Sequence, residues 1–134
     1  MCIRDSITIS TTGDSQDFGD LSTAEGGPFT CSNPVRTVRG GGGFNDGTVT
    51  IDYATIATLG NYADFGDLTQ QRYSAEGVAS PTRGVFGGGS ATPNYLDTID
   101  YVQIMTTGNA VDFGDLANTD RNYLFGASNG HGGL

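Results

Sequence analysis

The chain has 134 residues, including 22 glycines and 36% apolar residues, a composition that is poor for one compact, independent core. It contains 15 acidic residues against 6 basic ones, all of them arginine, and its formal net charge is -9. We therefore expect neither nucleic acid nor an anionic membrane surface as a partner, because no basic stripe is available to contact phosphates. No apolar run approaches the roughly 18 residues of a membrane-spanning helix, and no signal peptide is expected.

The first six residues, Met-Cys-Ile-Arg-Asp-Ser, resemble the translation of a sequencing-adapter end. We therefore expect 1–6 to be an artefact and the native sequence to begin near Ser6 or Ile7; the alternative is an ordinary N-terminus. In either case Cys31 has no credible partner, because the other cysteine, Cys2, falls in this segment. The sequence predicts no disulfide and leaves the redox compartment open.

One five-residue word, Asp-Phe-Gly-Asp-Leu, occurs three times, at spacings of 47 and 48 residues. A word that recurs at a period in the forties is typical of propeller blades. The chain is accordingly divided into repeats at 7–50 and 51–98 and a truncated third repeat at 99–134. The residues of this structural motif are Asp17, Phe18, Gly19, Asp20, Asp64, Phe65, Gly66, Asp67, Asp112, Phe113, Gly114 and Asp115.

Each complete unit is expected to contain four short antiparallel strands. Residues 75–80 form a short strand, residues 84–86 begin a second one that ends in a glycine triplet, and residues 98–105 form the strongest one. This third strand, whose equivalent is 49–56, lacks clean alternation, as expected of an inner strand covered on both sides. The motif strand follows as the fourth, outer strand. The predicted fold is all-β, a propeller fragment of about two and a half four-stranded antiparallel blades.

Blades bury their faces only against neighbouring blades, so a piece of this length is not expected to close a ring by itself. We expect the isolated chain to be marginal, aggregation-prone or oligomeric, with the rest of its own propeller as a partner. The glycine triplets at 40–42 and 87–89 are interpreted as strand ends where backbones crowd and no Cβ fits, because the lysine of a phosphate-binding loop is missing.

The run Arg83-Gly84-Val85-Phe86-Gly87-Gly88, the later strand with Tyr101 and an arginine after the fourth strand (Arg72 or Arg121) resemble kelch-type propeller repeats. This resemblance covers nearly everything after Ser6. The usual tryptophan of the fourth strand is absent, and the residues that stand in its place are Phe18, Phe65 and Phe113.

Two word-level repeats, at 98–101 and 128–133, are similar to those of marine phage and metagenomic repeat proteins of the virion structural or tail-fibre type. This resemblance implies a virion or extracellular location and a structural or adhesive role. This resemblance concerns short sequence repeats alone, so it does not identify the chemistry of any site.

The acidic motif has two competing interpretations. Its two carboxylates, three residues apart, suit Ca²⁺, which takes six to eight oxygen ligands; alternatively, they protect an exposed edge strand from pairing with another sheet. A third local carboxylate is missing from every copy, which favours the edge role and no metal. A kinase is excluded, because the chain has no lysine and no catalytic His-Arg-Asp.

No catalytic constellation is expected. His131 is the only histidine, and no serine or cysteine stands in a nucleophile motif. We therefore expect no catalytic residues, no enzyme activity and no cofactor. Arg36 and Arg83 occupy corresponding turns and are expected to bind a carboxylate, such as Asp20 or Asp67, or carbonyl groups of an adjacent unit. The alternative for both is a ligand-facing role.

The repeats differ most between the glycine triplet and the long strand, where 43–47 corresponds to 90–96 with different letters and an insertion. In repeat folds such differences mark surface loops, often on the binding face. The candidate ligand-binding residues are Phe44, Asn45, Asp46, Pro93, Asn94 and Tyr95. The predicted function is a non-catalytic binding or scaffold segment, of the phage virion or tail-fibre adhesin type, that contacts glycan or protein through these loops. Two alternatives remain: the scaffold portion of a larger propeller enzyme whose active site lies outside this sequence, and a purely architectural virion part.

Overall fold

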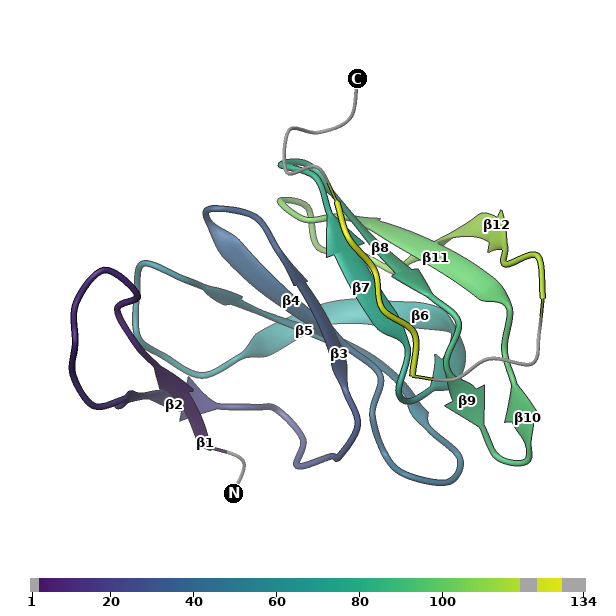
Figure 1. Cartoon of the computed structure of the whole chain (residues 1–134), viewed down its shortest axis with the longest axis horizontal. Helices are drawn as coiled ribbons and strands as arrows, with labels where there is room; N and C mark the ends of the chain where they lie inside the picture. Colours follow the sequence, from purple (N-terminus) through teal and green to yellow (C-terminus); the bar gives the residue numbers. More distant parts are fainter. Residues whose placement is uncertain (1–2, 119–122, 129–134) are drawn as a thin grey trace.

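The computed structural model describes residues 3–118 and 123–128. Within them the chain is all-β, as the sequence predicted, with two four-stranded antiparallel sheets and two two-stranded sheets (Figure 1). Of the residues discussed above, Cys2, Arg121, His131 and most of the 128–133 word lie outside the described residues.

The first large sheet contains β3 (Phe29–Ser32), β4 (Arg36–Gly40), β5 (Thr48–Thr55) and β6 (Ala63–Arg72), hydrogen-bonded in that order. Side chains in β3 alternate between buried and exposed, so Phe29 and Cys31 face the core. The interior strand β5 is buried or half-buried along most of its length. The β5–β6 register shifts at Ile51 and Asp52, opposite Gly66, whose φ is +148°. This shift is a β-bulge, which changes the direction of the last strand.

The second large sheet contains β7 (Glu76–Ala79), β8 (Arg83–Gly87), β11 (Thr98–Gln103) and β12 (Val111–Asp115), again paired in chain order. The four-stranded antiparallel unit is therefore present twice. The strand predicted at 98–105 ends two residues earlier, because the Thr106 N–H donates to the Gln103 carbonyl at 3.0 Å and closes a turn.

Two small sheets complete the described residues. The strand β1 (Ile3–Ser6) pairs with β2 (Gln16–Asp20), and β9 (Ser90–Ala91) pairs with β10 (Asn94–Tyr95). The β1–β2 pair has the register of the third and fourth strands of the large sheets, since Asp5 faces Asp17 directly after a register shift, as Asp52 faces Asp64. Residues 3–6 thus take the place of a third strand, while their origin in an adapter stays a prediction.

The two large sheets share one hydrophobic core. Phe29 of β3 meets Phe86 of β8 edge to face, with ring centroids 5.2 Å apart. Val38, Ile51 and Phe86 are fully buried in the same cluster. Burial of such a side chain contributes about 1.5–3 kcal/mol, so the contact between the sheets supplies a large part of the stability of this region. Neither sheet would bury its inner face alone.

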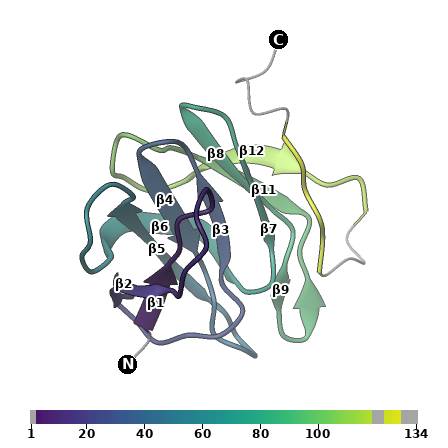
Figure 2. The same ribbon diagram turned by 60° about the vertical axis from the view of Figure 1, so that its left-hand side comes forward.

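The first strands of the two sheets, β3 and β7, lie side by side (Figures 1 and 2). A Cβ added at Gly77 of β7 would overlap the Thr30 carbonyl oxygen, and one at Gly84 of β8 would lie 2.5 Å from Cys31 Sγ. These glycines permit the close approach. The glycine triplets follow the same rule, because a Cβ at Gly41 would overlap the Arg72 carbonyl oxygen.

Candidate functional site

The repeated motif lies on the last strand of each unit, in β2, β6 and β12. In β6, Phe65 and Leu68 are buried in the core, whereas Asp64 and Asp67 are exposed. The motif therefore directs two apolar side chains inward and two carboxylates outward. Its backbone edge is occupied by the neighbouring unit.

Three hydrogen bonds attach each unit to the motif of the unit before it. In the second large sheet, the Gly108 N–H donates to the Phe65 carbonyl and the Ala110 N–H to the Asp67 carbonyl, both at 2.7 Å. The Asp67 N–H in turn donates to Asn109 Oδ1 at 3.1 Å. The first large sheet repeats all three bonds, with Gly60 and Tyr62 donating to Phe18 and Asp20, and Asn61 accepting from Asp20. The motif is thus an attachment edge for the hairpin between the third and fourth strands of the next unit.

The glycine of the motif is needed for this attachment. A Cβ at Gly66 would lie 2.5 Å from the carbonyl atoms of Gly108, and one at Gly19 would overlap the Gly60 carbonyl oxygen. Both motif glycines also have a φ near +147°, at +148° and +146°, which L side chains rarely adopt. Only glycine meets both requirements.

A buried carboxylate occupies the same position in both large sheets. Asp52 in β5 and Asp100 in β11 are fully buried, each directly after the register shift. An arginine pairs with each: Arg39 Nη1 lies 3.0 Å from Asp52 Oδ2, and Arg72 Nη2 lies 2.8 Å from Asp100 Oδ2. Each carboxylate also accepts a hydrogen bond from a hydroxyl of the preceding unit, that of Ser22 or Thr69. The buried charge is therefore compensated from two elements.

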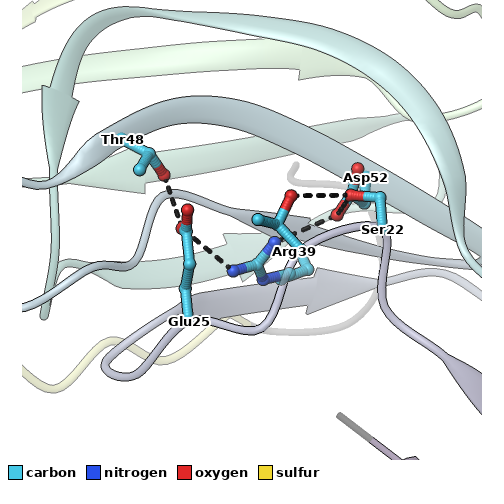
Figure 3. Close-up of polar contacts among 6 residues, drawn as sticks. Ser22, Glu25, Arg39, Thr48 and Asp52 are labelled. Carbon is cyan, nitrogen blue, oxygen red and sulfur yellow. Dashed lines mark hydrogen bonds and ion pairs between the residues drawn. The ribbon is translucent and has the colours of Figure 1, made fainter. Parts of the chain in front are cut away.

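Figure 3 shows the cluster around Arg39. Glu25 accepts a hydrogen bond from Thr48 Oγ1 at 2.8 Å and lies 3.5 Å from Arg39 Nη2. Arg39, which is 1% exposed, thus lies between Glu25 and Asp52. Because Arg39 and Asp52 are closed to solvent, the role of this pair is structural: removing one partner leaves an uncompensated buried charge.

The two sheets obtain their arginine from different positions. In the first sheet the arginine stands on the second strand, directly opposite the aspartate, and in the second sheet it comes from the end of the preceding sheet. The opposed pairs are Arg39 with Asp52, and Phe86 with Asp100. Arg72 stands one repeat after Glu25. Each buried aspartate is therefore paired with one guanidinium, although the arginine that provides it stands at a different repeat position in the two sheets.

These buried ion pairs were not predicted from the sequence. A signal was present, because a single aspartate interrupts the apolar third strand at Asp52 and at Asp100. A lone carboxylate in a strand covered on both faces predicts a buried partner. The arginine that would provide it could not be chosen from spacing, since it lies at different positions in the two units.

Arg36 and Arg83 pack on tyrosines of the neighbouring strand. Their guanidinium carbons lie 4.5 Å from the centroid of Tyr53 and 4.6 Å from that of Tyr101. Arg36 Nη1 also donates to the Ile104 carbonyl of the second sheet at 3.1 Å. For Arg36 the tie is therefore to a carbonyl of the adjacent unit, one of the two partners expected from the sequence.

Cys31 supplies no nucleophile. Burial raises the pKa of its thiol to about 12, so the thiol stays protonated at neutral pH, whereas the thiolate is the reactive form. A hollow of about 290 Å³ beside it, between β3 and β7, is lined by small and polar residues such as Thr30, Thr37 and Gly77. These groups do not form a recognisable catalytic arrangement.

The two candidate loops touch each other. The loop at 43–47 lies beside the β9–β10 hairpin at the lower edge of Figure 1, where the Thr92 N–H donates to the Asn45 carbonyl at 2.7 Å. Tyr73 joins both: its hydroxyl is 3.0 Å from Thr92 Oγ1, and its ring is 6.0 Å from that of Phe44 in an edge-to-face arrangement. Tyr73 follows the last residue of β6 and was not among the candidates. It is placed beside both loops by its antiparallel β-bridge with Ser90, a pairing that the sequence does not reveal.

All six candidate residues are exposed, and together with Tyr73 they form what we call the loop surface. Phe44 is 64% exposed and Tyr95 is 49% exposed. The ring of Phe44 is nevertheless held in place, because it packs so closely on Gly26 that a Cβ there would overlap it. The loop surface therefore presents two exposed aromatic rings beside the polar side chains of Asn45, Asp46 and Asn94.

Within residues 3–118 and 123–128, no group of three or more His, Cys, Asp and Glu side chains is arranged to hold a metal ion. The same part of the chain contains no helix of the length and apolarity that a membrane span needs. No protein-family model matches the chain, and no curated protein sequence matches it.

Proposed function

We propose that this chain is a non-catalytic binding and scaffold segment that contacts a glycan or protein through the loop surface. The observation that carries the proposal is the hydrogen bond between the Thr92 N–H and the Asn45 carbonyl, at 2.7 Å. It joins the two loops in which the repeats differ most, each from a different sheet. Regular units that bring their variable loops together are typical of binding proteins built on a rigid scaffold.

The units themselves are proposed to be blades of a kelch-like propeller. Three features support this arrangement: the four strands of each large sheet follow one another in chain order, the first strands β3 and β7 are neighbours, and each hairpin attaches to the last strand of the previous unit. Blades arranged about an axis place their first strands together at the centre. The proposed setting is a virion or tail-fibre adhesin, and neighbouring virion genes would support it.

A neutral glycan is the ligand that the loop surface suits best. The exposed rings of Phe44 and Tyr95 offer apolar faces to the C–H groups of a sugar, and the amides of Asn45 and Asn94 offer both donors and acceptors to its hydroxyls. Asp46 and the net charge of -9 disfavour polyanionic glycans and acidic proteins.

A glycan array on the 134-residue chain tests the proposal. Tyr95→Ala is expected to weaken binding about tenfold while the melting temperature is unchanged. Phe44→Ala is expected to weaken binding by a similar factor with a small fall in melting temperature, because the Phe44 ring also packs on Gly26 and Tyr73. Phe125→Ala is the matched control, since Phe125 is an aromatic residue that is 98% exposed outside the loop surface. Binding that survives both loop changes, or turnover in a hydrolase and oxidase panel that they do not affect, would contradict the proposal. Turnover by a longer form of the protein would favour the larger propeller enzyme.

A further inference from the structure

The last described motif strand has an open edge of the kind that is covered elsewhere in the chain. We call β12 (Val111–Asp115) the acceptor edge. Phe113 is 54% exposed there, whereas the equivalent Phe65 is 2% exposed beneath the next unit. Gly114 has the motif conformation, with a φ of +135°, but a Cβ added to it would meet no atom within 4 Å, unlike one at Gly66. Within the described residues, the acceptor edge is preformed and uncovered.

The complementary element is present at the other end of the described chain. The donor hairpin, residues 11–15, corresponds to the hairpins that carry Asn61 and Asn109. It is exposed along its whole length. Its Gly13 and Ser15 hold the positions of the two N–H donors, and Asp14 holds the position of the side-chain acceptor. The chain thus contains both halves of a contact that it already makes twice internally.

We propose that the donor hairpin of a second copy of this chain binds the acceptor edge, so that copies associate head to tail. The Gly13 N–H of one copy donates to the Phe113 carbonyl of the other, and the Ser15 N–H donates to the Asp115 carbonyl. Asp14 accepts from the Asp115 N–H. The contact continues the two internal attachments without a change of register, and Phe113 becomes buried as Phe65 is. Because the two faces differ, the contact is heterologous: an assembly closes into a ring where the rotation between copies allows it and otherwise has one free edge at each end.

Charge makes this contact weaker than the internal ones. Each copy has a net charge of -9, and Asp14 would approach the carboxylates of Asp112 and Asp115, where the internal hairpins present a neutral asparagine. Repulsion of this kind is screened by salt. Association is therefore expected to rise with ionic strength, in contrast to contacts that depend on opposite charges.

Sedimentation velocity on the 134-residue chain, over a range of concentration and salt, tests the proposal. The unaltered chain is expected to associate reversibly, and more strongly at high salt. Asp14→Asn, which copies Asn61 and Asn109, should tighten association several-fold. Asp14→Ala, which removes the acceptor together with the repulsive charge, should not tighten it. A chain that stays monomeric throughout, or equal effects of the two Asp14 changes, would overturn the proposal.

Mixing two blocked variants tests the direction of the contact. Phe113→Asp blocks the acceptor edge, and Asp14→Ala combined with Ser15→Pro blocks the donor hairpin, so each variant alone should be monomeric. Their equimolar mixture should form a heterodimer and no larger species, because one good copy of each face remains. Association of either variant alone, or none in the mixture, would contradict head-to-tail docking. Circular dichroism and protection of Cys31 from thiol reagents verify folding; if Phe113→Asp fails to fold, the exposed Asp14 variants still decide the question.

Discussion

Each buried aspartate of this chain requires its own arginine. Asp52 and Asp100 are both fully buried, and each receives one guanidinium and one hydroxyl. Burial lowers the pKa of Arg72 below its ordinary value, and the Asp100 carboxylate opposes this effect. Arg72 thus remains a cation that compensates the carboxylate, in a pair whose loss would expose a bare charge to the core.

Moving the arginine of the first sheet to the position used in the second should recover part of the stability that is lost when Arg39 alone is replaced. Arg39→Phe alone leaves Asp52 buried without a cation and is expected to cost about 3–5 kcal/mol. Glu25→Arg alone places a second guanidinium beside that of Arg39. The double variant copies the arrangement of Arg72, Phe86 and Asp100, so in urea unfolding it should be about 2 kcal/mol more stable than the sum of the single changes predicts. Glu25→Gln with Arg39→Phe is the control that supplies no cation, and an equal recovery there would refute the explanation.

Cys31 should report on the integrity of the core. In a Cys2→Ala background it is the only thiol, and a thiol reagent at neutral pH should modify it only as the chain unfolds, because burial raises its pKa to about 12. Its ordinary value is near 9, so the unfolded chain loses the proton first as pH rises. The stabilising contribution is therefore complete below pH 9 and decreases by about 1.4 kcal/mol per pH unit above it. Cys31→Ala should abolish this part of the alkaline slope, and identical slopes for the two proteins would contradict the assignment.

The strands were predictable because their signals are local. Residues 98–105 are rich in β-branched and aromatic side chains, and the glycine triplets and prolines mark the turns, so the four-stranded units could be read from the chain. The ion pairs and the role of Tyr73 were not predictable, because they depend on which strands become neighbours. The two loops were selected as the places where the repeats differ. Their mutual contact emerges only from the way in which β9 and β10 fold back beside Tyr73.

At the level of elements, the hairpin between the third and fourth strands acts as a connector. Asn109 accepts from the Asp67 N–H at 3.1 Å, and Asn61 accepts from the Asp20 N–H at 3.0 Å. These contacts lie at the exposed rim of the interface, so each contributes the modest free energy of a single hydrogen bond. These hydrogen bonds also fix the register between neighbouring units.

A matched pair of substitutions should separate the acceptor of this hairpin from its charge. Asn109→Ala removes the acceptor and should lower the free energy of unfolding by about 1 kcal/mol. Asn109→Asp keeps an acceptor oxygen and places there the residue that Asp14 provides in the first hairpin, so its effect should be smaller. Chemical unfolding, together with hydrogen exchange of the Ala110 amide, would measure both. Equal losses for the two variants would show that the side-chain oxygen does not hold the hairpin.

On the scale of the whole molecule, stability depends on contacts between successive units. The two large sheets share one core and repeat one attachment, in which the motif of one unit receives the hairpin of the next. In such arrays a unit is stabilised mainly by its neighbours. The docked hairpin therefore explains the glycine and the backbone geometry of the repeated motif, and the proposed ligand site is the loop surface, where the units differ.

Chemical unfolding of Gly66→Ala and Gly114→Ala, in a Phe113→Asp background that excludes docking of a second copy, tests whether the motif is the attachment edge between units. Both glycines have a strongly positive φ, at +148° and +135°, so both changes incur backbone strain of about 1–2 kcal/mol. Only the Cβ at position 66 meets the backbone of the next unit, at 2.5 Å from Gly108. We predict that Gly66→Ala destabilises the chain by at least about 2 kcal/mol more than Gly114→Ala, as expected of added overpacking. Equal losses would contradict the assignment of the motif as the attachment edge between units.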